Sequence, residues 1–148
     1  MKRLPRRERL AATLERNSIP EPNSGCYLWL ARVDRSGYGW MYVDSNTRCG
    51  SVHRIAFELA NGAIPDGMVL DHRCRTPICT NADHLEVVTR RVNTLRGIGP
   101  SAVNATKKCC GQGHPLSGEN LYVAPGGKRV CKACRRATKA RYLTRRVR

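Results

Sequence analysis

Between Met68 and Asn93 the chain reads MVLDHRCRTPICTNADHLEVVTRRVN. The segment Met68–His72 is an apolar run that ends in two polar side chains, which is typical of a short buried strand leading into a loop. The loop is rich in Cys, Pro and Asn. Further along, Thr89 is a suitable N-cap and Gly97 a suitable C′ residue for a helix that carries Asn93. These residues predict a strand–loop–helix unit, with chemistry at the strand end.

The loop after this strand carries three metal-ligand side chains in the spacing Cys74-x4-Cys79-x4-His84. In a reducing compartment, Cys and His at such short spacings indicate zinc rather than disulfides. A fourth ligand is needed, and the candidates are Cys26, which we favour because it starts a predicted strand, Cys49 and His53. A site closed by four protein ligands has no open position for chemistry, so we expect a structural zinc.

The N-terminal part of the chain has its own periodicities. Residues 6–17 have apolar side chains at helical spacing, and 19–25 (IPEPNSG) break that pattern. Residues 26–31, 38–43 and 48–52 are rich in β-formers and separated by turn residues, which predicts a three-stranded antiparallel meander. Residues 53–61 return to helical spacing before GAIPDG ends the helix. We therefore expect an α+β fold with a small antiparallel sheet.

A second Cys/His group lies near the C-terminus. Cys110-x3-His114 and Cys131-x2-Cys134 are two close pairs that could converge on one tetrahedral zinc ion. Cys109 is an alternative to Cys110. Residues 99–106, small and weakly patterned, are expected to be a linker to this module.

Positive charge is concentrated at the two ends of the chain. The formal net charge is +16; residues 1–16 hold six Lys or Arg against two Glu, residues 17–100 hold nine against eight acids, and residues 101–148 hold twelve against one. Basic arms of this kind attract a polyanion by releasing its counterions. We expect the C-terminal tail to contact nucleic acid through Arg135, Arg136, Lys139 and Arg141. No segment approaches the roughly 20 apolar residues of a membrane span, which disfavours a membrane or secreted protein.

Several motifs together resemble a known family. The pattern VHRIAFE (52–58), GAIPDGMVLDH (62–72), Cys74, Cys79, Asn81, His84-Leu85, Val88-Thr89 and Asn93 resembles the HNH endonucleases of phages. The Cys and His spacing of the loop is also similar to that of the His-Cys box homing endonucleases, which share a ββα-metal core. With GCYLW (25–29), the resemblance covers residues 25–97, and the C-terminal module resembles one often appended to these phage enzymes.

The resemblance implies roles for individual residues. His72 would be the general base, and Asn93 with Asp71 would hold a catalytic Mg²⁺ or Mn²⁺. Arg54 is a candidate for holding the scissile phosphate, although it is as readily a structural arginine. The structural zinc sites would be Cys26, Cys74, Cys79 and His84, and Cys110, His114, Cys131 and Cys134. His84 would be a zinc ligand, in the place of the middle Asn of many HNH enzymes.

The resemblance also implies an organisation and a function. The expected parts are a basic helix and linker (1–24), an HNH nuclease domain (25–98), a linker (99–106), a zinc module (107–134) and a basic tail (135–148). The expected activity is homing-type nicking or double-strand cleavage of double-stranded DNA in the cytoplasm of the host of a phage or mobile element, with a homodimer left open. The main alternative is a zinc-stabilised DNA- or RNA-binding regulator that does not cut.

Overall fold

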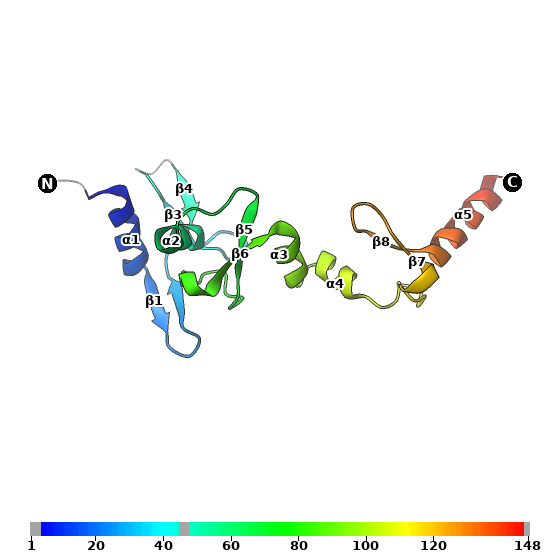
Figure 1. The fold of residues 1–148 in the computed structure, drawn as a ribbon, viewed down its shortest axis with the longest axis horizontal. Helices are drawn as coiled ribbons and strands as arrows, with labels where there is room; N and C mark the ends of the chain where they lie inside the picture. Colours follow the sequence, from blue (N-terminus) through cyan, green and yellow to red (C-terminus); the bar gives the residue numbers. More distant parts are fainter. Residues whose placement is uncertain (1–3, 45–47, 147–148) are drawn as a thin grey trace. The chain divides into compact units, whose positions relative to one another are not determined.

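The computed structural model of the chain describes residues 4–44 and 48–146 (Figure 1). The elements, in order, are α1 (Arg6–Arg16), β1 (Ser18–Glu21), β2 (Cys26–Trp29), β3 (Trp40–Tyr42), β4 (Cys49–Ser51), α2 (Val52–Asn61), β5 (Met68–His72), the 3-10 turn η1 (Ala82–His84), β6 (Leu85–Thr89), α3 (Arg90–Arg96), α4 (Pro100–Thr106), the 3-10 turn η2 (Gly118–Asn120), β7 (Leu121–Val123), β8 (Arg129–Cys131) and α5 (Lys132–Arg146). Mixed helices and small antiparallel sheets confirm the α+β class. The chain forms two compact units, Met1–Asn93 (unit 1) and Thr94–Arg148 (unit 2).

The β-strands of the described residues form four separate two-stranded sheets. The prediction of a single meander was wrong in this respect, because β2 pairs with β1 while β3 pairs with β4. The strand β1 lies where a linker was expected. Its Pro20 is tolerated because β1 is an edge strand, where a missing N–H breaks no ladder bond.

A small core holds unit 1 together. The buried side chains of Trp29, Met41, Val52 and Ile55 form it, and Leu10 and Leu14 of α1, with Val43, Leu59 and Ile78, pack against it. Gly39 makes this packing feasible, since a Cβ there would lie 2.5 Å from Cγ2 of Val52 and 2.6 Å from Cδ1 of Trp29. The predicted helices 6–17 and 53–61 therefore exist because each has an apolar stripe facing this core.

The strand–loop–helix unit has a second strand, giving β5, β6 and α3. β5 and β6 are antiparallel, with His72 opposite Leu85 and Asp71 opposite Glu86. The hydroxyl of Thr89 accepts a hydrogen bond from the backbone N–H of Val92 at 3.2 Å, as expected of an N-cap. This ββα arrangement carries His72 on its first strand and Asn93 on its helix.

Unit 2 contains a helix, α4, where a linker was expected. Pro100 opens α4 at a position where its missing N–H costs nothing. The guanidinium of Arg129 caps the other end, donating to the carbonyls of Asn104, Ala105 and Lys107 at 2.8–3.0 Å and to that of Leu116 at 3.0 Å. The half-buried side chain of Arg129 thus stabilises a helix that the local sequence did not indicate.

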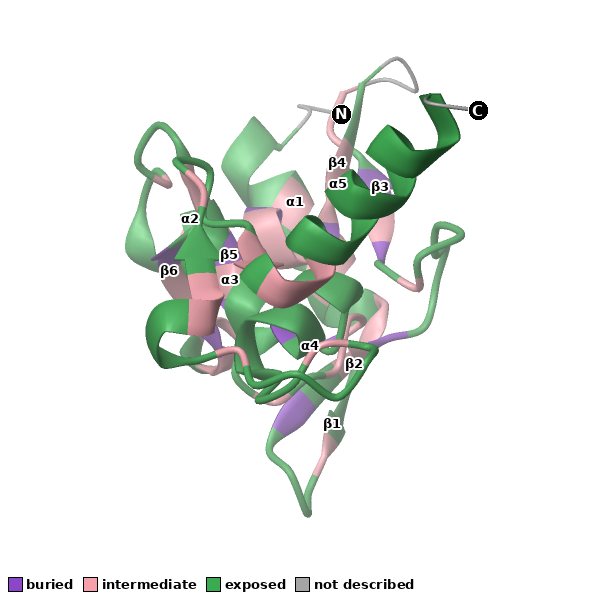
Figure 2. Ribbon diagram, turned by 90° about the vertical axis from the view of Figure 1, so that its right-hand side faces the viewer, coloured by how far each residue is buried: buried purple, intermediate pink, exposed green. Residues whose placement is uncertain are grey.

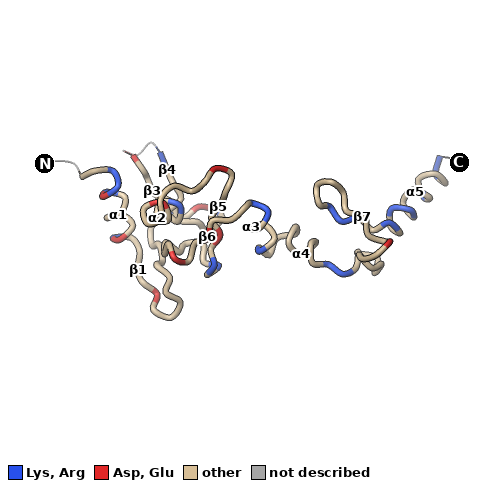
Figure 3. Tube along the Cα trace, in the orientation of Figure 1, with Lys and Arg blue, Asp and Glu red and all other residues tan. Residues whose placement is uncertain are grey.

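The rest of unit 2 is the hairpin β7–β8 and the long helix α5, which begins at Lys132, inside the stretch expected to form the module. Figure 2 shows α5 exposed over most of its length, and no residue of it is buried. Lys and Arg recur along it in Figure 3. None of the described helices combines the length and the apolar character needed to cross a membrane.

Candidate active site and metal clusters

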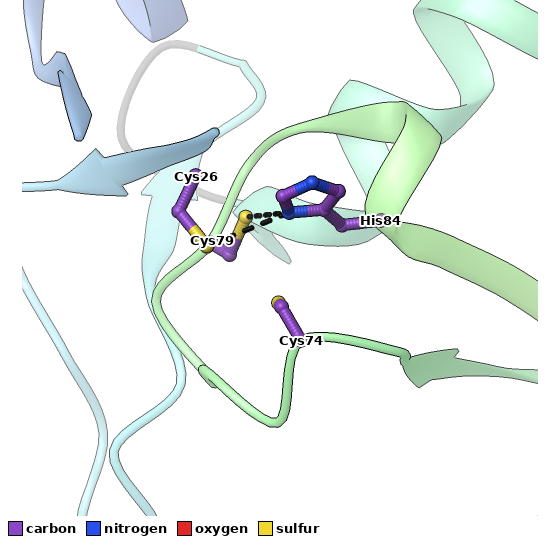
Figure 4. A group of neighbouring side chains, drawn as sticks. All are labelled: Cys26, Cys74, Cys79 and His84. Atoms are coloured by element: carbon purple, nitrogen blue, oxygen red, sulfur yellow. Dashed lines mark hydrogen bonds between the residues drawn. The ribbon is translucent and has the colours of Figure 1, made fainter. Parts of the chain in front are cut away.

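The first Cys/His cluster consists of Cys26, Cys74, Cys79 and His84, and its four side chains converge (Figure 4). Their candidate ligand atoms all lie within 4.8 Å of one another. Nδ1 of His84 is 3.5 Å from Sγ of Cys26 and 3.6 Å from Sγ of Cys79. Cys26 and Cys79 are buried. The structure therefore brings Cys26 to the loop, whereas Cys49 is exposed and His53 lies outside the cluster.

Backbone pairing between β2 and the loop brings this cluster together. Trp29 donates its N–H to the carbonyl of Ile78 at 3.0 Å, and Thr80 donates to the carbonyl of Tyr27 at 2.8 Å. Nδ2 of Asn81 donates to the carbonyl of Gly25 at 2.7 Å. The loop thus lies alongside β2, with an isolated antiparallel bridge between Leu28 and Cys79. This pairing explains how Cys26 meets candidate ligands some fifty residues later in the chain.

The thiols of this cluster influence one another's charge. Burial acts to raise the pKa of Cys26, but hydrogen bonds from Ser24, Cys79 and His84 lower it to about 7. Burial raises the pKa of Cys79 to about 12. One thiol therefore ionises readily while its neighbour resists a second negative charge. A bound divalent cation would supply the charge that lets both be thiolates.

The second cluster consists of Cys110, His114, Cys131 and Cys134, again with all candidate ligand atoms within 4.8 Å of one another. Nδ1 of His114 is 3.4 Å from Sγ of Cys110 and 3.3 Å from Sγ of Cys134. The backbone N–H of Cys134 lowers the pKa of Cys131 to about 6, while the thiol of Cys110 raises the pKa of Cys134 to about 11. Cys109 is exposed and lies outside the cluster.

Both clusters could hold zinc. Each offers three sulfurs and one imidazole nitrogen, which is a donor set that tetrahedral structural zinc accepts. In each, a backbone N–H also donates to a ligand sulfur, from Asn81 to Cys79 and from Gln112 to Cys110, both at 3.4 Å. Asn120, which sequence analysis did not identify, supports the second cluster by accepting from the N–H of Ala133 at 2.9 Å.

His72 lies at the end of β5 beside the first cluster. The residue is only 6% exposed, and Nε2 lies 3.2 Å from the carbonyl oxygen of Cys79. Because a carbonyl can only accept, Nε2 carries the hydrogen, and Nδ1 of the neutral ring is left with a free lone pair. Burial lowers the pKa of His72, so the ring is neutral at physiological pH. A neutral imidazole with a fixed tautomer is suited to accept a proton.

Asp71 has different surroundings from its neighbour. β5 continues through His72, so the two adjacent side chains leave opposite faces of the strand. Oδ1 of the buried Asp71 accepts from Nη1 of Arg75 at 2.9 Å in an ion pair. The strand does not end between Asp71 and His72, so their side chains are not turned to the same side.

Two ring side chains that sequence analysis did not connect with His72 lie against it. The ring of His53 is 5.0 Å from that of His72, and the ring of Tyr38 is 5.3 Å from His53 and 5.9 Å from His72, centroid to centroid. Nδ1 of His53 is buried and has no hydrogen-bond partner in the described part of the chain. Burial and the charges of His72 and Arg54 lower the pKa of His53 to about 4. The spacing of Tyr38, His53 and His72 along the sequence did not indicate that their rings would lie together.

The remaining candidates occupy other places. Asn93 is half-buried on α3, and Arg54 lines a hollow between α1, β4 and α2. On α5, Arg135 and Lys139 line a hollow of about 700 Å³ together with Lys128 and Tyr142, whereas Arg136 and Arg141 do not. The four basic residues expected to contact nucleic acid therefore lie on different sides of the helix.

Comparison with known proteins decides the family. Residues 51–95, which include α2, β5, β6 and all of α3 except its last residue, match the family model described as HNH endonuclease. The chain belongs to the HNH endonuclease family. In this HNH chain the match contains His72, three candidate ligands of the first cluster and Asn93.

The HNH chain is also similar to phage proteins. It is 31% identical to protein 2.8 of Escherichia phage T7 over 76 residues, 51% of each chain, and 35% identical to protein 7.7 of the same phage over 69 residues, 47% of this chain and 52% of that one. It is 30% identical over 91 residues to an uncharacterized gene 5.3 protein of Enterobacteria phage T3, covering 57% of this chain and 86% of that one. The chain spans about half the length of the two T7 proteins, and no solved structure matches it.

Proposed function

We propose that this HNH chain is a divalent-metal-dependent endonuclease that hydrolyses phosphodiester bonds of double-stranded DNA, with His72 as the general base. The observation that carries the proposal is the 3.2 Å contact between Nε2 of His72 and the carbonyl oxygen of Cys79. It holds the ring by one nitrogen and leaves the other to take a proton from water. The similarity to T7 and T3 phage proteins supports a role in the cytoplasm of a phage-infected cell.

The catalytic cation would be held by Asn93, and by Asp71 only if the end of β5 turns its carboxylate to the side of His72. Their amide and carboxylate oxygens are ligands that Mg²⁺ and Mn²⁺ accept. In the structure, Oδ1 of Asp71 accepts a hydrogen bond from Arg75. When bound, such a cation neutralises charge on the phosphate and on the departing oxygen. The side chains of the protein would do the rest of the chemistry. His72 would accept the proton of the attacking water, and the first Cys/His cluster would keep the carbonyl of Cys79 in place.

The positive charge of the chain supports double-stranded DNA as the substrate. The segment 101–148 carries twelve Lys or Arg against one acid, and α5 exposes most of them. Lys128, Arg135 and Lys139 line one hollow with Tyr142, so phosphates and a sugar or base could be contacted on that side of α5. The basic helix supplies affinity that is independent of sequence, which is what a cutting domain needs to stay on its substrate.

Replacement of His72 tests the proposal. Purified protein with Mg²⁺ should nick or cut duplex DNA, and His72→Gln should reduce the cutting rate by about 10²–10⁴-fold, because glutamine keeps an N–H donor for the carbonyl but no base. The variant should keep wild-type zinc content and DNA affinity. Undiminished cutting by His72→Gln, in a preparation free of other nucleases, would overturn the assignment. Binding with no cutting by the wild-type protein would instead support a regulator.

A further inference from the structure

Unit 1 contains a hollow of about 490 Å³ between α1, β4 and α2, outside the group around His72. Four arginines line it: Arg6 and Arg7 from α1, Arg48 beside β4, and Arg54 from α2. We call it the arginine groove. Its floor is apolar, since Leu10, Ile55 and Leu59 of the core also line it. Figure 1 shows α1 beside α2, and the two helices are in contact.

The charges of the arginine groove are only partly used within the chain. Glu58 is the one acidic residue in its lining. Arg7 is anchored, because its Nη2 donates to the carbonyl of Leu59 at 2.6 Å, and Arg6 forms an exposed ion pair with Asp44 at 3.6 Å. Neither Arg48 nor Arg54 forms an ion pair with any carboxylate of residues 4–44 and 48–146. Guanidinium groups without a carboxylate partner, such as those of Arg48 and Arg54, attract an anion when other arginines lie beside them.

We infer that the arginine groove binds the phosphate backbone of DNA outside the bond that is cut. Its arginines come from α1, from α2 and from the residue before β4, so the positive charge is spread along a groove, as an extended polyanion requires. A guanidinium can bind a phosphate through two parallel hydrogen bonds, and the apolar floor suits the deoxyribose between phosphates. The inference rests on the proposed function, since it assigns the same substrate to a second place on unit 1.

The position of Arg54 supports this assignment over contact with the scissile phosphate. His53 and Arg54 are consecutive on α2, and successive helical residues point about 100° apart. The ring of His53 lies against His72, while Arg54 lines the arginine groove with Arg48. The helix therefore separates the two side chains, and Arg54 is a binding residue for a neighbouring phosphate.

Salt-dependent binding tests the inference in the cleavage-deficient His72→Gln background. The double variant Arg48→Ala/Arg54→Ala should bind a short mixed-sequence duplex about tenfold or more weakly at low salt, because two charged hydrogen-bond donors are lost. The slope of log affinity against log salt should fall by about 1.8, or 0.9 for each phosphate contact. The matched control is Arg9→Ala/Arg16→Ala, which removes the same charge from exposed positions of α1 outside the groove and should change the slope by less than half as much. Circular dichroism and zinc content should be unchanged in both.

Cleavage kinetics in protein that keeps His72 distinguish binding of a neighbouring phosphate by Arg54 from contact with the scissile phosphate. With Mg²⁺, Arg54→Ala should raise KM by more than it lowers kcat. A loss confined to kcat would show that Arg54 contacts the scissile phosphate and would overturn the inference.

Equal salt slopes for the groove and control variants would also overturn it, as would saturable binding of inorganic phosphate in the groove with no effect on duplex affinity. If the wild-type protein does not cut but the groove variant still loses its salt slope, the proposed function fails and the groove stands. If the wild-type protein cuts and the slope is unchanged, only the groove fails.

Discussion

The two Cys/His clusters have the same ligand types but different surroundings. The first lies beside a core of Trp29, Met41, Val52 and Ile55, and it joins β2 to a loop far along the chain. The second lies in unit 2, where only Ala102 and Cys131 are buried among the described residues. Metal at the first cluster would position a loop on a core that already exists. Metal at the second would replace the core.

The largest expected effect is therefore in unit 2. Cys134→Ala should remove one of about two zinc ions per chain and with it most of the amide-exchange protection of unit 2, because zinc binding contributes about 10–16 kcal/mol in small zinc modules. Unit 1 should keep its protection. Cys109→Ala is the control, since Cys109 is exposed and outside the cluster. Metal analysis with hydrogen exchange measures both, and retained protection in unit 2 would show that the two clusters do not differ in this way.

A smaller, more local effect is expected at the first cluster. Cys79→Ala should release its zinc and loosen the loop around Cys74, while α2 and the core keep their exchange protection. Cutting should fall by about 10²-fold, because the carbonyl that orients His72 is no longer held in place. Cys109→Ala, at an exposed thiol outside both Cys/His clusters, should cut at the wild-type rate. Full unfolding of unit 1 in Cys79→Ala would remove the contrast with unit 2.

The smallest effect is a pH dependence confined to unit 1. Burial and neighbouring charges hold the pKa of His53 at about 4, below its ordinary 6.5. The unfolded chain therefore binds this proton more readily, and stability present above pH 6.5 is lost as the pH falls towards 4. Urea unfolding of unit 1 at a series of pH values should be less pH-dependent in His53→Phe than in the wild-type protein at equal zinc content. His53→Gln controls for polarity, and parallel curves for wild type and His53→Phe would refute the effect.

Local patterns predicted the helices α1 and α2, the strand β5 and the helix α3, because each has its own apolar stripe or cap. They missed β1, since IPEPNSG has the composition of a linker and becomes a strand only by pairing with β2. They missed α4, whose last carbonyls are bonded by Arg129 from another part of the chain. They also grouped three strands into one meander, because nothing local indicated that β2 would pair with β1 and with the loop at Ile78 and Thr80.

The candidate site was likewise predicted in part from local sequence and missed in part. The close pairs and triplets of Cys and His were visible as spacings, and the resemblance to HNH endonucleases drew attention to His72 and Asn93. The choice of Cys26 over Cys49 or His53 depended on long-range backbone pairing, which spacing does not encode. The neighbourhood of His53, Tyr38 and His72 brings together three segments, so its only sequence-level sign was three ring side chains at unrelated positions.

The four hydrogen bonds of Arg129 have a consequence for the order in which the chain is made. Its guanidinium reaches carbonyls that lie 13 to 25 residues earlier. During synthesis from the N-terminus, α4 leaves the ribosome well before the residue that caps it. The carbonyls at the end of α4 therefore lack these hydrogen bonds until Arg129 of β8 has been made.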